Sequence, residues 1–201
     1  MTAIIGRKGS GKSQLMLDLL LNPRGFCGVY DEIIFISPTF ESQFESLWST
    51  LRPKGISVYE NLTAELLDEI RMKQMQFQKS ERPQILVIFD DNSELMRHLD
   101  STTVNFFVSN SRHAHISCVF VCQKIMQMPT CVRCNTDSYI TFSACSEIEI
   151  NALFKEVSVV DKKRFLRLFR EITLEPFAFF TITIVGGKLN FYKKFDEIIN
   201  L

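Results

Sequence analysis

The chain has no excess charge of either sign. Its 23 lysines and arginines balance 23 aspartates and glutamates, so global charge gives no support for nucleic-acid binding, although a ring or channel needs only local basic loops. No apolar run approaches the roughly 18 residues of a transmembrane helix, which excludes an ordinary membrane span. The opening MTAIIG is too short for a signal peptide, so we expect no secretion signal.

The cysteines lack the spacing of a metal centre. Cys118 and Cys122 fall in an apolar run, where reduced cysteine behaves as a small hydrophobic residue. Cys131 and Cys134 form a CxxC pair, but no second CxxC and no HxxxH follows, so incidental core or loop cysteines are favoured over a zinc or redox site. Without a secretion signal, a reducing compartment is expected.

The sequence alternates apolar β-branched runs with amphipathic segments through its first two thirds. This alternation predicts an α/β fold with a mainly parallel sheet and helices on both faces. Two helical segments and a pair of extended runs around Gly186 and Gly187 predict C-terminal helices and a β-hairpin. We expect a core domain over residues 1–145, with 146–201 packed on it. Expected strands are 2–5, 32–37, 56–60, 84–91, 116–123 and 138–142, and expected helices are 12–21, 40–51, 63–79, 102–113, 146–157 and 159–172.

The stretch GRKGSGKS fits the P-loop pattern GxxxxGK[ST] without a mismatch. Its glycines let backbone N–H groups curl around phosphates, and a strand before it and a helix after it are the expected context. Lys12 is predicted to reach the β- and γ-phosphates, and the Ser13 hydroxyl is predicted to bind Mg²⁺. The predicted nucleotide-binding residues are Gly6, Arg7, Lys8, Gly9, Ser10, Gly11, Lys12 and Ser13.

Two acids end the apolar run ILVIFDD. Asp90 is the natural Walker B acid, which orients Mg²⁺ at the end of a buried strand. Asp91 is positioned to polarise the attacking water, a role that usually falls to the longer glutamate; the alternative is that Asp91 only caps the next turn. Acids at both positions favour hydrolysis over phosphoryl transfer to a small substrate.

The run ISCVFVCQ places Gln123 at the carboxyl end of a further buried strand. In a P-loop sheet with a strand inserted between the Walker A and Walker B strands, that edge faces the γ-phosphate. An amide there can hydrogen-bond the γ-phosphate or the attacking water, so Gln123 is interpreted as a sensor. The alternative is a strand-end cap.

Four stretches occur in a fixed order: GRKGSGKS, ILVIFDD, NSRHAHISCVFVCQ and MPTCVRCNTDSYITF. With the tail EPFAFFTITIVGGKLNFYKKFDEII, they resemble the poxvirus-type genome-packaging ATPases of the FtsK–HerA superfamily, a group of ASCE/RecA-like P-loop motors. The resemblance covers essentially the whole chain. It implies ATP hydrolysis, with Mg²⁺, coupled to translocation of double-stranded DNA into a preformed capsid through its portal vertex. It also implies a location in the host cytoplasm, the viral factory or the virion.

By this resemblance, Gly6–Ser13 bind ATP, Asp90 and Asp91 handle Mg²⁺ and water, and Gln123 acts as the sensor. Ring motors usually complete the site with an arginine from the neighbouring subunit. Arg112 is favoured for that role, with Arg133 as second choice or as a partner in cis, and both are expected near the carboxyl edge of the sheet. The alternative for each is a salt bridge.

A finger in trans implies a homo-oligomeric ring, pentameric or hexameric. Two rival functions remain open from the sequence: a nucleotide or small-molecule kinase on the same fold, and a low-turnover nucleotide-dependent assembly switch. DNA phosphates would need basic contacts, although a solvated charged helix face is the alternative interpretation. The unranked candidates are Arg52, Lys54, Arg71, Lys73, Lys79, Lys162, Lys163, Arg164, Arg167 and Arg170.

Overall fold

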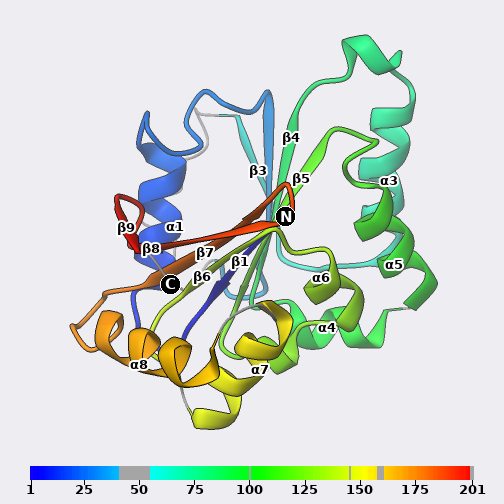
Figure 1. The fold of residues 1–201 in the computed structure, drawn as a ribbon. Coiled ribbons are helices and arrows are strands. Elements are labelled where there is room, and N and C mark those ends of the chain that lie inside the picture. Colours follow the sequence, from blue (N-terminus) through cyan, green and yellow to red (C-terminus); the bar gives the residue numbers. More distant parts are fainter. Residues whose placement is uncertain (41–54, 100, 145, 158–160, 200–201) are drawn as a thin grey trace. The chain divides into compact units, whose positions relative to one another are not determined.

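The computed structural model describes residues 1–40, 55–99, 101–144, 146–157 and 161–199. Nearly all of the helix predicted at 40–51 lies outside these residues. Contacts divide the chain into two compact units, each considered by itself: unit 1 is Met1–Lys12 with Cys122–Leu201, and unit 2 is Ser13–Val121. The predicted division into 1–145 and 146–201 is a different one and stays a prediction. Figure 1 labels the elements along the chain.

The strands of unit 2 are β2 (Glu32–Ile36), β3 (Ile56–Tyr59), β4 (Ile85–Asp90) and β5 (Ile116–Cys122). All of their pairings are parallel, with β2 between β3 and β4, and β5 on the far side of β4. Every residue of β4 is buried, as its continuous apolar run predicts for a central parallel strand. Burial also raises the pKa of the Cys118 thiol in β5 to about 12, which confirms its interpretation as a core residue.

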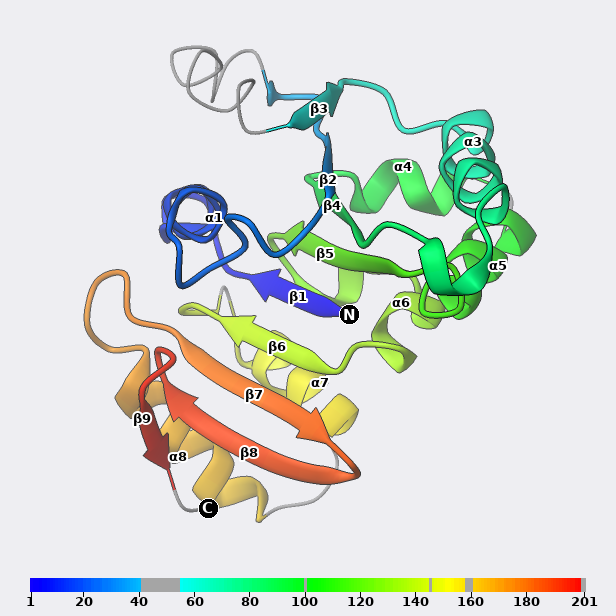
Figure 2. The same cartoon turned by 90° about the horizontal axis from the view of Figure 1, so that it is seen from above.

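The helices of unit 2 are α1 (Lys12–Leu21, with Lys12 still in unit 1), α3 (Ala64–Met75), α4 (Ser93–His98) and α5 (Ser101–Asn110), with a 3₁₀ turn, η2, at Lys79–Glu81. Helices α3 and α5 lie side by side (Figures 1 and 2). Thr63 caps the start of α3, because its hydroxyl accepts the Leu66 N–H at 3.2 Å. The predicted continuation of this helix to Lys79 is wrong, because Gln78 is extended with ψ of 147°.

The strands of unit 1 are β1 (Thr2–Ile5), β6 (Ser138–Thr141), β7 (Phe180–Val185), β8 (Lys188–Lys193) and β9 (Glu197–Ile199). β1 and β6 are parallel, whereas β6, β7, β8 and β9 pair antiparallel in that order. The predicted hairpin is confirmed: Gly186 and Gly187 both have positive φ, the conformation that a two-residue turn requires. The chain is therefore α/β with mainly parallel pairing in its predicted core, as expected.

The helices of unit 1 are α6 (Thr130–Cys134), α7 (Glu147–Val157) and α8 (Lys162–Ile172), with a 3₁₀ turn, η3, at Ile125–Gln127. Helices α7 and α8 lie on one face of the strands of this unit (Figure 2). Phe165 of α8 is fully buried, and its ring centroid lies 6.0 Å from that of Phe180 in β7 and 5.5 Å from that of Phe154 in α7. This aromatic cluster joins both helices to the strands.

No helix among the described residues has the length and hydropathy to span a membrane.

Phe165→Ala is expected to lower the free energy of unfolding by about 3–5 kcal/mol, because it leaves a cavity between two helices and a strand. Urea unfolding followed by circular dichroism measures the change. Val185→Ala is the matched control: that side chain is 67% exposed, and its loss is expected to cost less than about 0.5 kcal/mol. Equal losses in the two variants would contradict this account of the core.

Candidate functional site

The P-loop sequence lies where its context requires, directly after β1 and at the start of α1. The Lys12 ammonium donates hydrogen bonds to the carbonyl oxygens of Gly6 at 2.6 Å and Arg7 at 3.1 Å. Its charge is therefore held over the loop, within reach of any anion that the loop binds. Ser10 lies inside the loop: its N–H donates to the Arg7 carbonyl, and its hydroxyl is buried without a hydrogen-bond partner.

Two glycines of the loop are needed for different physical reasons. Gly11 has a φ of +102°, which L side chains rarely adopt, and a Cβ there would lie 3.1 Å from Cδ1 of Phe177. Gly6 has no such backbone requirement, but a Cβ would lie 2.6 Å from the Ser10 Oγ and 2.7 Å from the Phe142 Cβ. Steric limits therefore fix the first and last glycines of the motif.

Gln123 is close to the start of the P-loop within unit 1. It lines, with Gly6 and Glu149, a small cavity of about 20 Å³. The Gly6 N–H donates to the carbonyl oxygen of Cys122, the residue before Gln123, at 3.2 Å. The sensor role stays a prediction, but the position at the carboxyl end of β5 is as expected.

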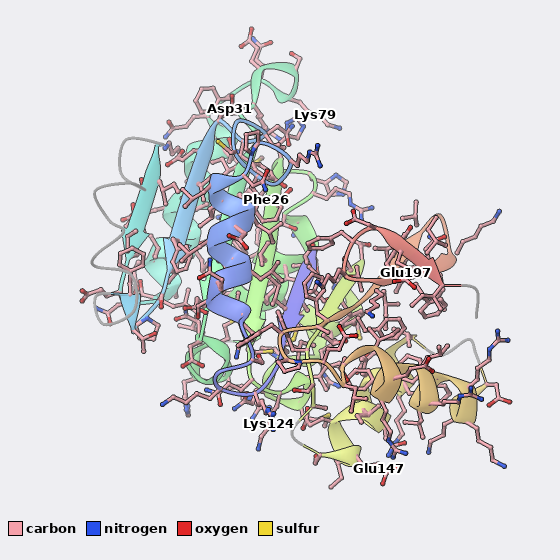
Figure 3. The ribbon with its side chains drawn as sticks, turned by 90° about the vertical axis from the view of Figure 1, so that its left-hand side faces the viewer. Phe26, Asp31, Lys79, Lys124, Glu147 and Glu197 are labelled. Atoms are coloured by element: carbon pink, nitrogen blue, oxygen red, sulfur yellow. The ribbon has the colours of Figure 1, made fainter. Side chains whose placement is uncertain are left out.

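Glu149 is a residue of this region that sequence reasoning missed. Its carboxylate accepts the N–H of Ile125 at 2.9 Å and so fixes the turn that follows Gln123. Lys124 and Glu147 lie toward the same end of unit 1, at the bottom of Figure 3. The sequence offers no signal for this contact, because Glu149 lies in a helix that begins more than twenty residues later.

Asp90 ends β4 with its carboxylate buried. The hydroxyl of Ser37, directly after β2, donates to Asp90 Oδ2 at 3.1 Å. The neighbouring Asp91 is exposed, has a left-handed backbone with φ of 54°, and donates its N–H to the carbonyl oxygen of Val121. The two acids therefore differ: the Asp90 side chain is buried at the end of β4, whereas the Asp91 side chain is exposed to solvent.

Asn92 holds this turn together. Its buried side-chain amide donates to the carbonyl oxygens of Ile36 at 2.6 Å and Asp90 at 2.9 Å, tying the ends of β2 and β4 to each other. Neither Asn92 nor Ser37 was a predicted site residue. The only sequence signal is a polar residue directly after an apolar run, in FISP and FDDN.

The residues predicted to hold Mg²⁺ offer the oxygen ligands that this ion prefers. Asp90 supplies a buried carboxylate, and Ser13 supplies a hydroxyl on the first turn of α1. Ser13 and Asp90 belong to unit 2, whereas Gly6–Lys12 and Gln123 belong to unit 1. The unit 2 residues supply oxygen ligands for Mg²⁺, and the unit 1 residues supply the groups predicted to bind and sense phosphates.

The expected placement of the two arginines near the carboxyl edge of the sheet is wrong. Arg112 lies in the turn just before β5, and β5 runs parallel to β4 with Ile116 opposite Ile85 and Val121 opposite Asp90. A residue that precedes a parallel strand lies at the edge where the strands begin. Arg112 is therefore separated from its own Asp90 by the length of β4, roughly 17 Å.

Arg133 has the same relation to β6, which begins five residues later beside the start of β1. Its guanidinium pairs with Glu156 of α7 at 2.5 Å, and its carbonyl oxygen accepts the Tyr139 hydroxyl at 2.9 Å. Burial, followed by the nearby Glu156 charge, raises the pKa of Tyr139 to about 12, so the hydroxyl keeps the proton it donates. Arg133 is thus held within unit 1, and the salt bridge proposed as its alternative role is present.

The CxxC pair lies on the short helix α6, with Cys131 partly buried and Cys134 exposed. Burial raises the pKa of the Cys131 thiol. In the part of the chain that the structure describes, no group of three or more histidine, cysteine or acidic side chains could hold a metal ion.

The basic residues proposed to contact DNA include a set on α3 and a set on α8. Lys73 pairs with Glu32 at 2.6 Å, and Arg71 pairs with Asp68 and lies 4.9 Å from the Phe106 ring centroid. The basic residues of α8 are exposed, and the structure pairs Arg170 with Glu147. Arg52 and Lys54 lie outside the described residues.

Comparisons with known proteins agree with the fold. The family model described as "Poxvirus A32 protein" matches residues 1–182. The genome-packaging NTPase of Sulfolobus turreted icosahedral virus 2, in complex with AMP, is 15% identical with a TM-score of 0.69 over 96% of each chain. The DNA-packaging ATPase of Sulfolobus turreted icosahedral virus is 17% identical with a TM-score of 0.67, again over 96% of each chain.

A more distant likeness is to the cytoplasmic domain of the type VII secretion ATPase EccC from Thermomonospora curvata. It is 14% identical with a TM-score of 0.56, over 96% of this chain and 25% of that one. The search of curated proteins gave no match. These solved structures carry the same α/β fold as the present chain.

Asn92→Ala is expected to lower the free energy of unfolding by about 2 kcal/mol, because it leaves two buried carbonyl oxygens without their donor. Thermal unfolding by calorimetry measures the loss. Asn110→Ala is the matched control: its amide donates to the Phe106 carbonyl oxygen at 2.9 Å in a solvent-exposed bond that water can replace. If both variants lost the same stability, the buried amide would not hold the strand ends together.

Proposed function

The chain belongs to the poxvirus A32 protein family, whose members are ATPases, and we propose that it is the motor that uses ATP to move double-stranded DNA into a preformed capsid. The observation that carries this proposal is the family match, which spans the P-loop, the Asp90–Asp91 pair and Gln123 in one alignment. The packaging NTPases with the same fold support it. We also propose that it acts in the host cytoplasm or the viral factory, where capsids would be filled.

We assign the chemistry of the site to residues whose surroundings fit each task. Lys12, now bonded to loop carbonyl oxygens, turns its ammonium to the phosphate oxygens of ATP. Asp90 and Ser13 hold Mg²⁺, which supplies charge neutralisation when bound. Asp91, exposed and raised on a left-handed turn, orients the attacking water, and Gln123 senses the γ-phosphate.

The position of Arg112 supports a role in trans. The residue is exposed at the edge where the strands of unit 2 begin, whereas Asp90 ends its strand at the opposite edge. It therefore cannot complete the site of its own subunit, but it can meet the acids of a neighbour. Arg133, which pairs with Glu156 within unit 1, stays the second candidate. We propose a homo-oligomeric ring in which Arg112 completes the adjacent site.

DNA phosphates would meet the exposed basic face of α8. Helix α8 is capped by Asp161, whose carboxylate accepts the N–H groups of Lys163 and Arg164. The basic residues therefore lie on a helix with a stabilised first turn. Phe165, Phe169 and Ile172 form the opposite, buried stripe. The basic side chains of α8 are therefore exposed on the solvent side of unit 1, where Arg170 pairs with Glu147.

ATP hydrolysis by the intact chain is expected to rise when linear double-stranded DNA is added, and Lys12→Ala is expected to abolish turnover because the charge at the phosphates is lost. Release of inorganic phosphate measures both. Lys124→Ala is the matched control, an exposed lysine outside the motif. Normal hydrolysis by Lys12→Ala would refute the site, and turnover that ignores DNA would refute the motor.

Arg112→Ala is expected to lower turnover at least about 100-fold while ATP still binds, because a finger stabilises charge only during transfer. Mixing Arg112→Ala with Lys12→Ala subunits is expected to restore part of the activity, since a mixed ring contains intact P-loops facing intact arginines. Phosphate release at a series of mixing ratios measures the rescue. No rescue at any ratio, with rings shown by light scattering, would contradict a role in trans.

A further inference from the structure

The segment between α8 and β7 lies against the P-loop within unit 1. A cleft of about 210 Å³ is lined by Arg7, Gly9 and Ser10 of the loop, by Phe142 and Ser143, and by residues 173–178. This volume is smaller than the roughly 300–1,000 Å³ of a pocket that encloses a whole small ligand, and one side of the cleft is the phosphate loop itself. The cleft therefore has room for part of a nucleotide beside its phosphates.

Phe177 is unusual in both its exposure and its backbone. It is 67% exposed, and Leu174 in the same segment is 83% exposed. Phe177 also has a φ of 62°, a left-handed conformation in which a bulky residue is a genuine outlier. Little burial is gained in return, and strain of this kind is found where a side chain is held for a ligand.

The ring of Phe177 is positioned by the P-loop. A Cβ on Gly11 would approach Phe177 Cδ1 to 3.1 Å, a tight contact, so the absence of a side chain at Gly11 lets the ring lie close against the loop. The same glycine shapes the phosphate loop with its φ of +102°. An aromatic ring is thus fixed beside the site where phosphates are expected.

We propose that Phe177 is the platform on which the base of bound ATP stacks, with Leu174 as its apolar border. This inference rests on the proposed function, since it takes the phosphates to lie on the P-loop. Aromatic stacking accepts any base because every base has a π-face, and a larger face gains more. The site is therefore expected to prefer purine over pyrimidine nucleotides.

The polar groups of the segment are already engaged. The Thr173 hydroxyl donates to the Phe169 carbonyl oxygen at 2.7 Å, and the Glu175 carboxylate pairs with Lys193 at 3.4 Å. Both side chains are bonded elsewhere, so this segment offers the base a stacking surface. ATP and GTP are accordingly expected to bind with similar affinity.

The test compares ATP with inorganic tripolyphosphate, which has phosphates but no base, by calorimetry on the full chain. Phe177→Ala is expected to weaken ATP binding by roughly 5- to 100-fold and to leave tripolyphosphate binding unchanged. Phe177→Tyr is expected to retain ATP affinity. Phe106→Ala is the matched control, an exposed phenylalanine in unit 2 that is expected to change neither affinity.

Other outcomes contradict either the role of Phe177 or the proposed function. Unchanged ATP affinity in Phe177→Ala overturns the platform and leaves the proposed function intact. Equal losses for ATP and tripolyphosphate also overturn it, because the ring would then only support the loop. Failure of the unaltered chain to bind either ligand overturns the proposed function and the platform with it. If Phe177→Ala does not fold, Phe177→Gly serves, since glycine adopts a φ of 62° without strain.

Discussion

The buried amide of Asn92 is the interaction on which the acidic half of the site depends. Strands β2 and β4 are parallel neighbours, and each ends in a carbonyl oxygen that accepts a hydrogen bond from Asn92. Asn92 donates to both, at 2.6 and 2.9 Å, and this lets the chain leave β4 in a left-handed turn at Asp91. With Ser37 holding the Asp90 carboxylate, the turn separates a fixed acid from an exposed one. Two adjacent residues of the same type thus acquire different environments.

Gly11 is the residue in unit 1 on which the local structure of the phosphate loop depends. Its positive φ belongs to the curl of the phosphate loop, and its missing side chain admits the ring of Phe177. One residue therefore couples a backbone requirement to a packing requirement. The loop is also held from the other end, where a Cβ on Gly6 would overlap Ser10 and Phe142. Rigid positioning of both ends suits a cradle that must keep its N–H groups aimed at one place.

Sequence patterns predicted the elements well where one physical signal dominates. β4 is apolar up to its last residue, Asp90, as suits a strand that is buried along its whole length, and the Gly186–Gly187 turn needs left-handed residues. The P-loop is recognisable because its glycines, lysine and serine each serve backbone or charge requirements at fixed spacing. Propensity failed at the end of α3: Gln76, Gln78 and Lys79 are good helix formers, but an extended Gln78 ends the helix early.

The contacts of the site were harder to predict because they join residues far apart in the chain. Ser37 meets Asp90 and Glu149 meets Ile125 only after strands and helices have packed. The only local sign of Ser37 is its place after an apolar run, and Glu149 has none. The arginines were misplaced for a different reason. They were placed from their order along the chain. Each lies instead at the end of a crossover connection, which has already carried the chain back to the edge where the next strand begins. Only strand register decides which edge a residue reaches.

Because its strands are parallel, unit 2 has two different ends. The acids stand at one edge and Arg112 at the other, so the two ends of the unit are unlike and each lacks what the other has. Copies of such an object that meet through these ends join head to tail, never face to face. A head-to-tail contact is heterologous: it closes into a ring when its rotation divides a full turn, and it grows into a filament when it does not. If copies assemble through these edges, the residues there would set the rotation between neighbours and so decide between a closed ring and an open filament.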